Sequence, residues 1–295
     1  MYKDFMPDRN GRASAREEFI SKHPDKLCGI LAKSILGKDI DYFKIGSGKR
    51  AVLAVGAHHG SEHITASALY DFLFYIAECS DTGASLSGIN ISFLLQKFTF
   101  FIIPCLNPDG VDMAISGIAK TPLYDRQLKM NGGSLDFSLW QANARGVDLN
   151  HNYNAGFFEY KKMEASEGII PGPTRYSGEF PESEPETKAL ASFVRTVAPE
   201  AVVSLHSQGG EIFSKPRGER VDKIAAALAK ISGYKTALAT GHAAYGGLSD
   251  YTGDVLGIPS FTVEVGTGEN PVSRKQLFPI CERVRKILVT LPTLL

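Results

Sequence analysis

From about residue 40 to the end of the chain, short hydrophobic runs alternate with segments whose apolar residues recur at helical spacing. Two β-prone runs, Ile40 to Ile45 and Ala51 to Ala57, are separated by a glycine-rich turn, which predicts a hairpin or another tight connection. From Ile64 to Ile76 the apolar residues recur every three or four positions, which predicts a helix. The continuous apolar character of Lys97 to Pro104 predicts a fully buried strand.

The second half of the chain continues this alternation. Ser183 and Glu186 have the spacing of a capping box, with Pro185 in the first turn, and predict the start of a helix. Ala201 to Leu205 and Ser260 to Val265 are predicted as buried strands. A C-terminal helix is predicted by four apolar residues at helical spacing, Leu277, Ile280, Val284 and Ile287. We see no linker, repeat or low-complexity segment, so the pattern indicates one α/β domain with mixed strand order.

A long stretch from Asn107 to about Gly178 lacks this regularity and is rich in glycine and asparagine. Irregular segments of that length are unusual inside a compact domain and are often functional. We therefore expect this stretch to form the wall of a binding site.

Composition narrows the class of partner and the setting. The 32 basic and 32 acidic residues cancel, which argues against binding to nucleic acid or to an anionic membrane, and favours a small molecule or peptide. The four cysteines are widely spaced, as in a reduced protein, and the charged N-terminus does not resemble a signal peptide. The most apolar stretch is about half a membrane span. We therefore expect a cytoplasmic protein.

Residues that bind metals follow three of the predicted strands. HHGSEH comes after the run at Ala51, HSQGG comes after Ala201 to Leu205, and Glu264 lies in the last predicted strand. The carboxyl ends of strands are where functional residues of α/β sheets collect. A catalytic zinc site takes three protein ligands and keeps an open position, and His59, Glu62 and His206 could supply that set. Glu264 is then the candidate general base for a water activated by the metal.

Seven motifs in order, GAHHGSE, PCLNPDGV, ARGVDLNHNY, SEPET, VSLHSQG, GGLSDY and PSFTVEVG, resemble the zinc carboxypeptidase family. The resemblance implies a single zinc carboxypeptidase-like catalytic domain over residues 1–295, with a mixed eight-stranded sheet flanked by helices. It implies one Zn²⁺ per chain, held by His59, Glu62 and His206, and peptide-bond hydrolysis with Glu264 as the base. The loops WQANARGVDLNHNYNAGF and GPTRYSGEFPESEPET are most similar to bacterial peptidases that cut γ-D-glutamyl-meso-diaminopimelate bonds in cell-wall (murein) peptides.

The sequence departs from the family where substrate is bound. The Asn-Arg pair that holds a terminal carboxylate in the best-known members is Asn150-His151 here, so a rigid bidentate donor is replaced by a histidine. Gln141 stands where many members have the arginine that stabilises the oxyanion. Arg145 and Arg126 are the nearby candidates for that role.

Other candidate substrate residues rest on the same resemblance. Alignment on GGLSD puts His242 at the position of a mobile tyrosine that covers substrate in the family, with Tyr245 close by. Asp250 corresponds to a residue of the substrate pocket. Residues 107–110, Asn-Pro-Asp-Gly, could form a simple turn, and the family match makes them site-shaping residues.

Three alternatives stay open from sequence. In an H-x-x-E-H helix, His59 and His63 would bind zinc and Glu62 would be the base. The chain could also be a non-catalytic zinc-binding module that kept the fold. Finally, it could be an ordinary metallocarboxypeptidase, or an amidohydrolase that removes an acyl group from a small amino acid.

Overall fold

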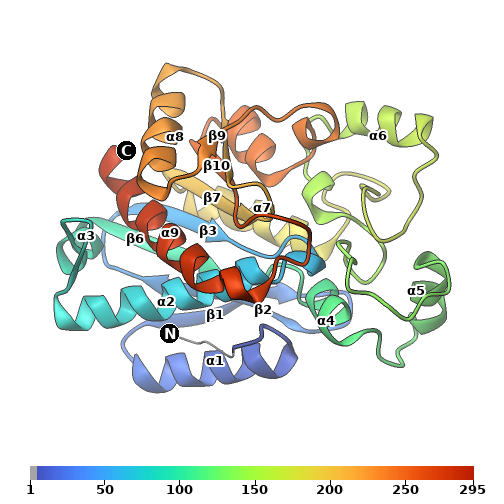
Figure 1. The fold of residues 1–295 in the computed structure, drawn as a ribbon, viewed down its shortest axis with the longest axis horizontal. Helices are drawn as coiled ribbons and strands as arrows, with labels where there is room; N and C mark the ends of the chain where they lie inside the picture. The colour runs from blue at the N-terminus through green and yellow to red at the C-terminus, as the bar shows by residue number, and fades with distance from the viewer. Residues whose placement is uncertain (1–4) are drawn as a thin grey trace.

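An eight-stranded mixed sheet runs through the molecule in the order β1-β2-β6-β3-β7-β10-β8-β9 (Figure 1). The computed structural model describes residues 5–295. The strands are β1 (Leu27–Lys33), β2 (Asp39–Ile45), β3 (Arg50–Val55), β6 (Phe98–Ile103), β7 (Ala201–His206), β8 (Glu211–Lys215), β9 (Lys235–Thr236) and β10 (Ser260–Glu264). A separate two-stranded ribbon is formed by β4 (Ser85–Leu86) and β5 (Ile89–Asn90).

The four central strands β6, β3, β7 and β10 are parallel, and β2 and β8 flank them antiparallel. A parallel strand with helices on both faces has no solvent-facing side, so its sequence reads as a continuous apolar run. All six residues of β7 are buried, as its pattern Ala-Val-Val-Ser-Leu-His predicts. The runs that we predicted as buried strands are therefore the centre of the sheet.

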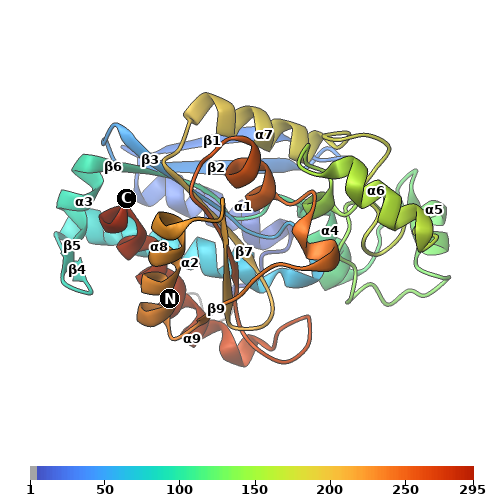
Figure 2. The ribbon, with the colours of Figure 1, turned by 90° about the horizontal axis from the view of Figure 1, so that it is seen from above.

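Helices cover both faces of the sheet, and Figure 2 shows α7 on one side with α2, α8 and α9 on the other. One apolar core lies under the larger group of helices, and a second lies under α7. Full burial of a Leu or Phe side chain stabilises the fold by roughly 1.5–3 kcal/mol. The helices of the first group are α1 (Arg9–Lys22), α2 (Ile64–Thr82), α3 (Ile91–Lys97), α8 (Glu219–Ser232) and α9 (Leu277–Thr290), and α7 is Pro185–Val197.

The stretch that we expected to be irregular contains three α-helices, α4 (Pro108–Ser116), α5 (Tyr124–Met130) and α6 (Phe157–Ser166). Asn107 caps α4, because its Oδ1 accepts a hydrogen bond from Gly110 N at 2.9 Å. Residues 107–110 are thus a helix start rather than a simple turn. The helices escaped prediction because they are short and are separated by segments that contain glycine. Shorter elements are a π-helix (Asp250–Val255) and 3-10 turns at Gly60–Glu62, Leu149–His151, Gly241–Ala244, Arg274–Gln276 and Leu291–Leu294.

Of the two forms predicted for the segment between β2 and β3, a hairpin is excluded, because β6 lies between these two strands. The connection is tight, as the glycines indicated, but it passes over the end of β6: Ser47 N bonds to Leu95 O at 2.9 Å. A Cβ on Gly48 would lie 1.9 Å from the carbonyl carbon of Lys97, so only glycine allows this crossing.

The predicted capping box at the start of α7 is also wrong. Glu184 occupies the cap position, and its side chain makes no capping bond to the helix. Asn152, from a distant segment, takes over: its Oδ1 accepts from Glu184 N at 3.2 Å and from the Thr187 hydroxyl. The side chain of Glu186 is buried instead of reaching back to the cap.

No helix within residues 5–295 is long and apolar enough to cross a membrane.

Candidate metal centre and active site

The carboxyl ends of β3, β7 and β10 lie side by side, because these strands are adjacent and parallel. His59 follows β3 by four positions, and His206 is the last residue of β7. Glu264, the last residue of β10, is the register partner of His206. The strand ends that we singled out in the sequence therefore meet at one edge of the sheet.

The segment after β3 makes a 3-10 turn at Gly60–Glu62 before α2 begins. Backbone bonds hold this turn against the long loop: Gly60 N donates to Gln141 O at 2.9 Å, and Ser61 N donates to Trp140 O at 2.8 Å. A Cβ on Gly60 would lie 2.3 Å from Gly110 O. Only glycine permits this close backbone contact, which sets the position of His59 and Glu62.

Three ligand atoms converge within 4.8 Å of one another, one each from His59, Glu62 and His206. His59 Nδ1 lies 2.9 Å from Glu62 Oε1, and His206 Nδ1 lies 3.1 Å from Glu62 Oε2. Two imidazoles and one carboxylate form a donor set that zinc prefers at catalytic sites. The three residues therefore fit a zinc ion.

The far nitrogen of each histidine ring is also held. His59 Nε2 lies 3.0 Å from Asp148 Oδ1, and His206 Nε2 lies 3.1 Å from Ser204 Oγ. With a metal bound, each ring would carry its proton on Nε2, next to these partners, and Nδ1 would present its lone pair to the metal. Such outer contacts orient metal ligands and increase their basicity.

Asp148 is a residue of this site that the sequence did not reveal. Its Oδ1 also accepts from Asn150 N at 3.1 Å, and its Oδ2 accepts from Arg175 N at 3.0 Å. An aspartate two positions before Asn150 suggests a local turn at most. Its contact with His59 spans 89 residues, and the motif carries no signal of it.

Electrostatics around the ligands favours a cation. Burial alone works to raise the pKa of Glu62, but the charge of His59 and hydrogen bonds from both histidines outweigh it and lower the pKa to about 2. Burial likewise opposes the charged form of His59, yet Glu62 and Asp148 together raise its pKa well above the ordinary value. Both carboxylates are thus ionised: Glu62 at the centre would attract a divalent cation, and Asp148 lies behind the His59 ring.

Burial, followed by the negative charge of Glu62, raises the pKa of Glu264 well above the ordinary value for glutamate. A carboxylate tuned upward in this way takes up protons more readily near neutral pH.

His63 does not join the cluster, which contains His59, Glu62 and His206 among the described residues. His63 precedes α2 as its cap residue, and its Nδ1 is buried without a hydrogen-bond partner. Burial lowers the pKa of His63 to about 4. The H-x-x-E-H helix interpretation needs both histidines on one helix, and the observed 3-10 turn with His206 as third ligand contradicts it.

Four predicted substrate residues form a continuous wall. His151 Nδ1 donates to Tyr245 O at 2.8 Å, and Asn150 Oδ1 accepts from Leu248 N at 3.2 Å. Asp250 Oδ2 accepts from Gly247 N at 3.0 Å, which places it beside the same loop. Since Asn150 also contacts Asp148, the wall is joined to the metal centre through one side chain.

The structure pairs His242 and Arg145 with other groups. His242 Nε2 lies 2.8 Å from Glu167 Oε1, and the Arg145 guanidinium lies 2.9 Å from Glu184 Oε2. Arg126 is exposed on α5. Gln141 lies next to the site, because its backbone holds Gly60, and its Oε1 accepts from the Thr174 hydroxyl.

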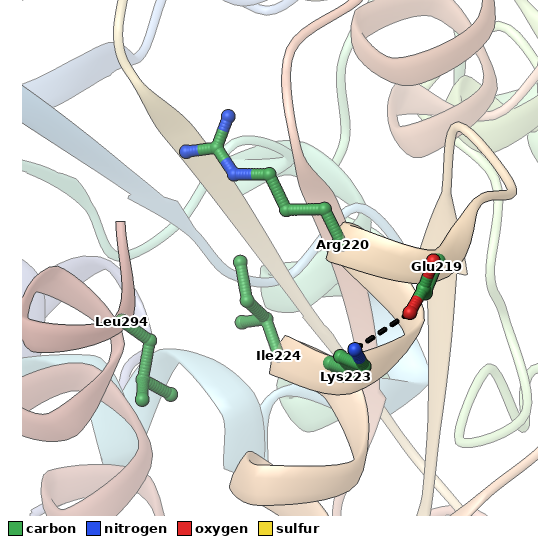
Figure 3. A pocket seen from close by; sticks show the side chains of 5 residues that line it. All are labelled: Glu219, Arg220, Lys223, Ile224 and Leu294. Atoms are coloured by element: carbon green, nitrogen blue, oxygen red, sulfur yellow. Dashed lines mark hydrogen bonds and ion pairs between the residues drawn. The ribbon is translucent and has the colours of Figure 1, made fainter.

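A separate pocket of about 490 Å³ lies between α8 and the C-terminal turn (Figure 3). It contains none of the site residues predicted from sequence. Its lining residues are Glu219, Arg220, Lys223, Ile224 and Leu294.

Comparison with known proteins identifies the family. Residues 14–286 match the zinc carboxypeptidase family, a range that includes all three candidate ligands and Glu264. The chain belongs to the zinc carboxypeptidase family. Its cofactor is therefore zinc, with His59, Glu62 and His206 as the candidate site, and its class of activity is that of a metallopeptidase.

A bacterial and an animal protein are both similar in sequence to this chain. It is 30% identical over 248 residues to γ-D-glutamyl-L-diamino acid endopeptidase 1 of Lysinibacillus sphaericus, covering 82% of this chain and 61% of that protein. Carboxypeptidase B of Bos taurus is 27% identical over 197 residues, covering 65% of this chain and 42% of that protein. The chain thus spans less than two thirds of the length of either protein.

Solved structures of the zinc carboxypeptidase fold confirm the architecture. Bovine thrombin-activatable fibrinolysis inhibitor, bound to tick carboxypeptidase inhibitor, superposes with a TM-score of 0.74 at 20% identity, covering 99% of this chain and 98% of that one. Murein-tripeptide amidase MpaA of Escherichia coli O157 superposes with a TM-score of 0.57 at 20% identity, covering 89% and 91%. The expected mixed eight-stranded sheet flanked by helices is confirmed.

Proposed function

We propose that this zinc metallopeptidase hydrolyses the bond between γ-D-glutamate and a diamino acid, such as meso-diaminopimelate, in peptides derived from murein. The observation that carries the proposal is the environment of His151. This ring is stacked on Tyr160, with centroids 4.0 Å apart, and its Nδ1 is held by the backbone of Tyr245. Burial lowers its pKa below the ordinary value for histidine, so the ring is neutral at pH 7.

A neutral, immobilised imidazole is a poor partner for a free terminal carboxylate, which arginine would hold with two charged hydrogen bonds. The residue after the cut bond therefore does not have to be the C-terminal residue of the substrate. A γ-D-glutamyl-diamino acid linkage inside a longer peptide satisfies this condition. The similarity to the Lysinibacillus endopeptidase supports the same class of substrate.

Each residue of the site then has a part in hydrolysis. A zinc ion held by His59, Glu62 and His206 would polarise the cut carbonyl and lower the pKa of a water to about 7. Glu264 accepts a proton from the attacking water and delivers it to the leaving amine of the diamino acid. Gln141 offers its neutral amide nitrogen as a donor beside the site, because the Thr174 hydroxyl bonds to its Oε1 and not to its Nε2. It is our candidate for hydrogen bonding to the developing oxyanion.

We also propose that the protein acts in the cytoplasm. All four cysteines are free, and three of them are buried. Reduced buried cysteines are usual in the cytoplasm, where murein fragments would be processed after uptake or before export.

The test is to incubate the enzyme with three classes of compound and identify products by mass spectrometry. These are peptides with a γ-D-glutamyl-diaminopimelate bond, ordinary peptides with a free C-terminus, and N-acylated amino acids. We expect cleavage only in the first class, at the γ-D-glutamyl bond. Cleavage only of ordinary peptides would make the protein a metallocarboxypeptidase, and cleavage only of acylated amino acids would make it a deacylase. Zinc binding with no hydrolysis in any class would make it a binding module.

A further inference from the structure

The face of the sheet that carries Glu264 continues as a partly exposed strip across β8. In the antiparallel pairing of β10 with β8, Glu264 is opposite Glu211, Thr262 is opposite Phe213, and Ser260 is opposite Lys215. Side chains alternate between faces along a strand, so these six share one face. On β8 the residues of this face are half-buried, whereas the two between them are buried. The strip therefore extends from the general base toward Lys215.

Lys215 lies at the far end of this strip, between two carboxylates. Its Nζ lies 3.3 Å from Asp250 Oδ1 and 2.7 Å from Asp254 Oδ2. The three side chains differ in exposure: Asp250 is 10% exposed, Lys215 is 20% exposed, and Asp254 is 44% exposed. Burying charged groups costs desolvation free energy that an exposed ion pair does not lose. Replacing a buried ion pair by apolar residues of similar volume often leaves the stability of the fold unchanged. Stability alone therefore gives little reason for the charged group.

This charged group is connected to the predicted substrate wall. Asp250 accepts from Gly247 N, and the neighbouring Leu248 N donates to Asn150. Between Lys215 and Glu264 the strip offers a hydroxyl pair, Ser249 with Thr262 at 2.7 Å. The strip is thus bounded by the catalytic base at one end and by the charged group at the other.

The length of the strip suits a long side chain. Glu211 and Lys215 are four positions apart on β8, which is about 13 Å at 3.3 Å per residue. In a diaminopimelyl residue the distance from the cut carbonyl to the distal carboxyl carbon is roughly 9 Å when extended, from standard bond lengths. The distal carboxyl group of such a substrate would therefore come within about 4 Å of the position of Lys215 along the strand.

We propose that Lys215, Asp250 and Asp254 form the site that recognises the distal amino-acid end of a diaminopimelyl substrate, and that Lys215 determines specificity for its carboxylate. The inference rests on the function proposed above. The distal end carries one ammonium and one carboxylate. Lys215 binds the carboxylate, and Asp254, the more exposed acid, binds the ammonium while Asp250 keeps Lys215 in place. A lysyl substrate lacks the carboxylate and makes only the second contact.

The first test uses the unmodified enzyme and three peptides with the same γ-D-glutamyl bond. The residue after the bond is meso-diaminopimelate, meso-diaminopimelate amidated at its distal carboxylate, or L-lysine. We expect kcat/KM for the first to exceed the other two by roughly 10- to 100-fold, the value of a hydrogen bond to a charged group. Equal kcat/KM for all three overturns the inference alone. Failure to cleave any of them overturns the proposed function and the inference with it.

The second test uses variants and a matched control. Lys215→Met should reduce the preference for diaminopimelate over lysine toward unity, chiefly through KM, and Lys215→Arg should retain most of it. The control is Lys223→Met, which removes a lysine paired with Glu219 at 2.6 Å on the surface of α8 (Figure 3). It should leave the preference unchanged. An unchanged preference in Lys215→Met, with native thermal stability, would overturn the assignment. If Lys215→Met does not fold, the other two measurements still test the inference. A lost preference in Lys215→Arg, or equal cleavage of the amidated and unmodified peptides, would overturn it.

Discussion

The Nε2 atom of His59 lies 3.0 Å from Oδ1 of Asp148, while Nδ1 of the same ring faces Glu62. One carboxylate thus fixes the tautomer of a metal ligand from outside, and a second lies beside the ligand atom. Because Asp148 is also bonded to two backbone amides, at Asn150 and Arg175, the ring is held by a group that cannot easily turn.

This arrangement predicts that Asp148→Asn weakens zinc binding. An amide retains the shape but loses the charge, and loss of such an outer partner typically costs 10- to 100-fold in metal affinity or activity. Competition with a chelator should show a zinc dissociation constant raised by about that factor. Asp25→Asn, at an exposed carboxylate paired with Lys26, is the control and should leave zinc affinity unchanged. Native affinity in Asp148→Asn would contradict the role of this contact.

His63 and His59 should differ in their effect on metal content. His63→Ala is expected to retain one zinc per chain, because His63 lies outside the ligand cluster. His59→Ala should lose the metal, since only two ligands remain. Metal analysis of the two purified variants decides. Loss of zinc in His63→Ala would restore the H-x-x-E-H interpretation.

Gly60→Ala should destabilise the fold and weaken zinc binding together. The added Cβ would lie 2.3 Å from Gly110 O, so the turn that carries His59 and Glu62 must shift. Forcing extra atoms into a packed site typically costs about 1–3 kcal/mol. The control is Gly218→Ala, where a Cβ meets nothing within 4 Å. Thermal unfolding of both variants, with and without zinc, should show a loss of stability and of zinc binding in Gly60→Ala only. Equal stabilities of the two variants would contradict this account of Gly60.

Glu186 predicts a pH dependence of stability. Burial, followed by the charges of Glu184 and Asp109, raises the pKa of Glu186 from its ordinary value of 4.5 to about 8. Between these values the folded chain keeps a proton that the unfolded chain releases. The stability from this group is therefore complete below pH 4.5 and is lost as the pH rises toward 8.

Glu186→Gln should remove this dependence, since glutamine stays neutral. Relative to the variant, the unmodified protein should lose up to about 1.4 kcal/mol per pH unit as the pH rises through that range. Denaturant unfolding at pH 5 and pH 8 provides the measurement. Glu179→Gln, at an exposed glutamate, is the control. Parallel pH profiles for the unmodified protein and Glu186→Gln would show that Glu186 is ionised in the folded state.

The central strands and the metal ligands were predictable because each depends on a local pattern. The run Ala201 to Leu205 is buried on both faces and ends at His206, so its apolar sequence indicated both the strand and the ligand position. The H-x-x-E spacing puts His59 and Glu62 about one turn apart, so both side chains can face one point, as they do in the 3-10 turn.

What failed depends on contacts between distant segments. Asn152 replaces the capping box at α7, and a remote side chain of this kind leaves no trace in the sequence around Ser183. The sequence could not decide between a hairpin and another tight connection, because strand order is set by β6, which begins more than fifty residues after β2 ends. The residues predicted to bind substrate also depend on distant contacts, and they do not all lie together. Asn150, His151 and Asp250 lie around one loop, whereas Arg145 pairs with Glu184.

The central claim is that His59, Glu62 and His206 hold zinc while Glu264 moves the proton. Glu264→Gln tests it most directly, because the amide fits the same space but cannot act as a base. Zinc content and turnover of a γ-D-glutamyl-diaminopimelate peptide should be measured on the same preparation. We predict one zinc per chain and a loss of kcat of about 10²- to 10⁴-fold. Turnover at the unmodified rate, or loss of the zinc, would contradict the account.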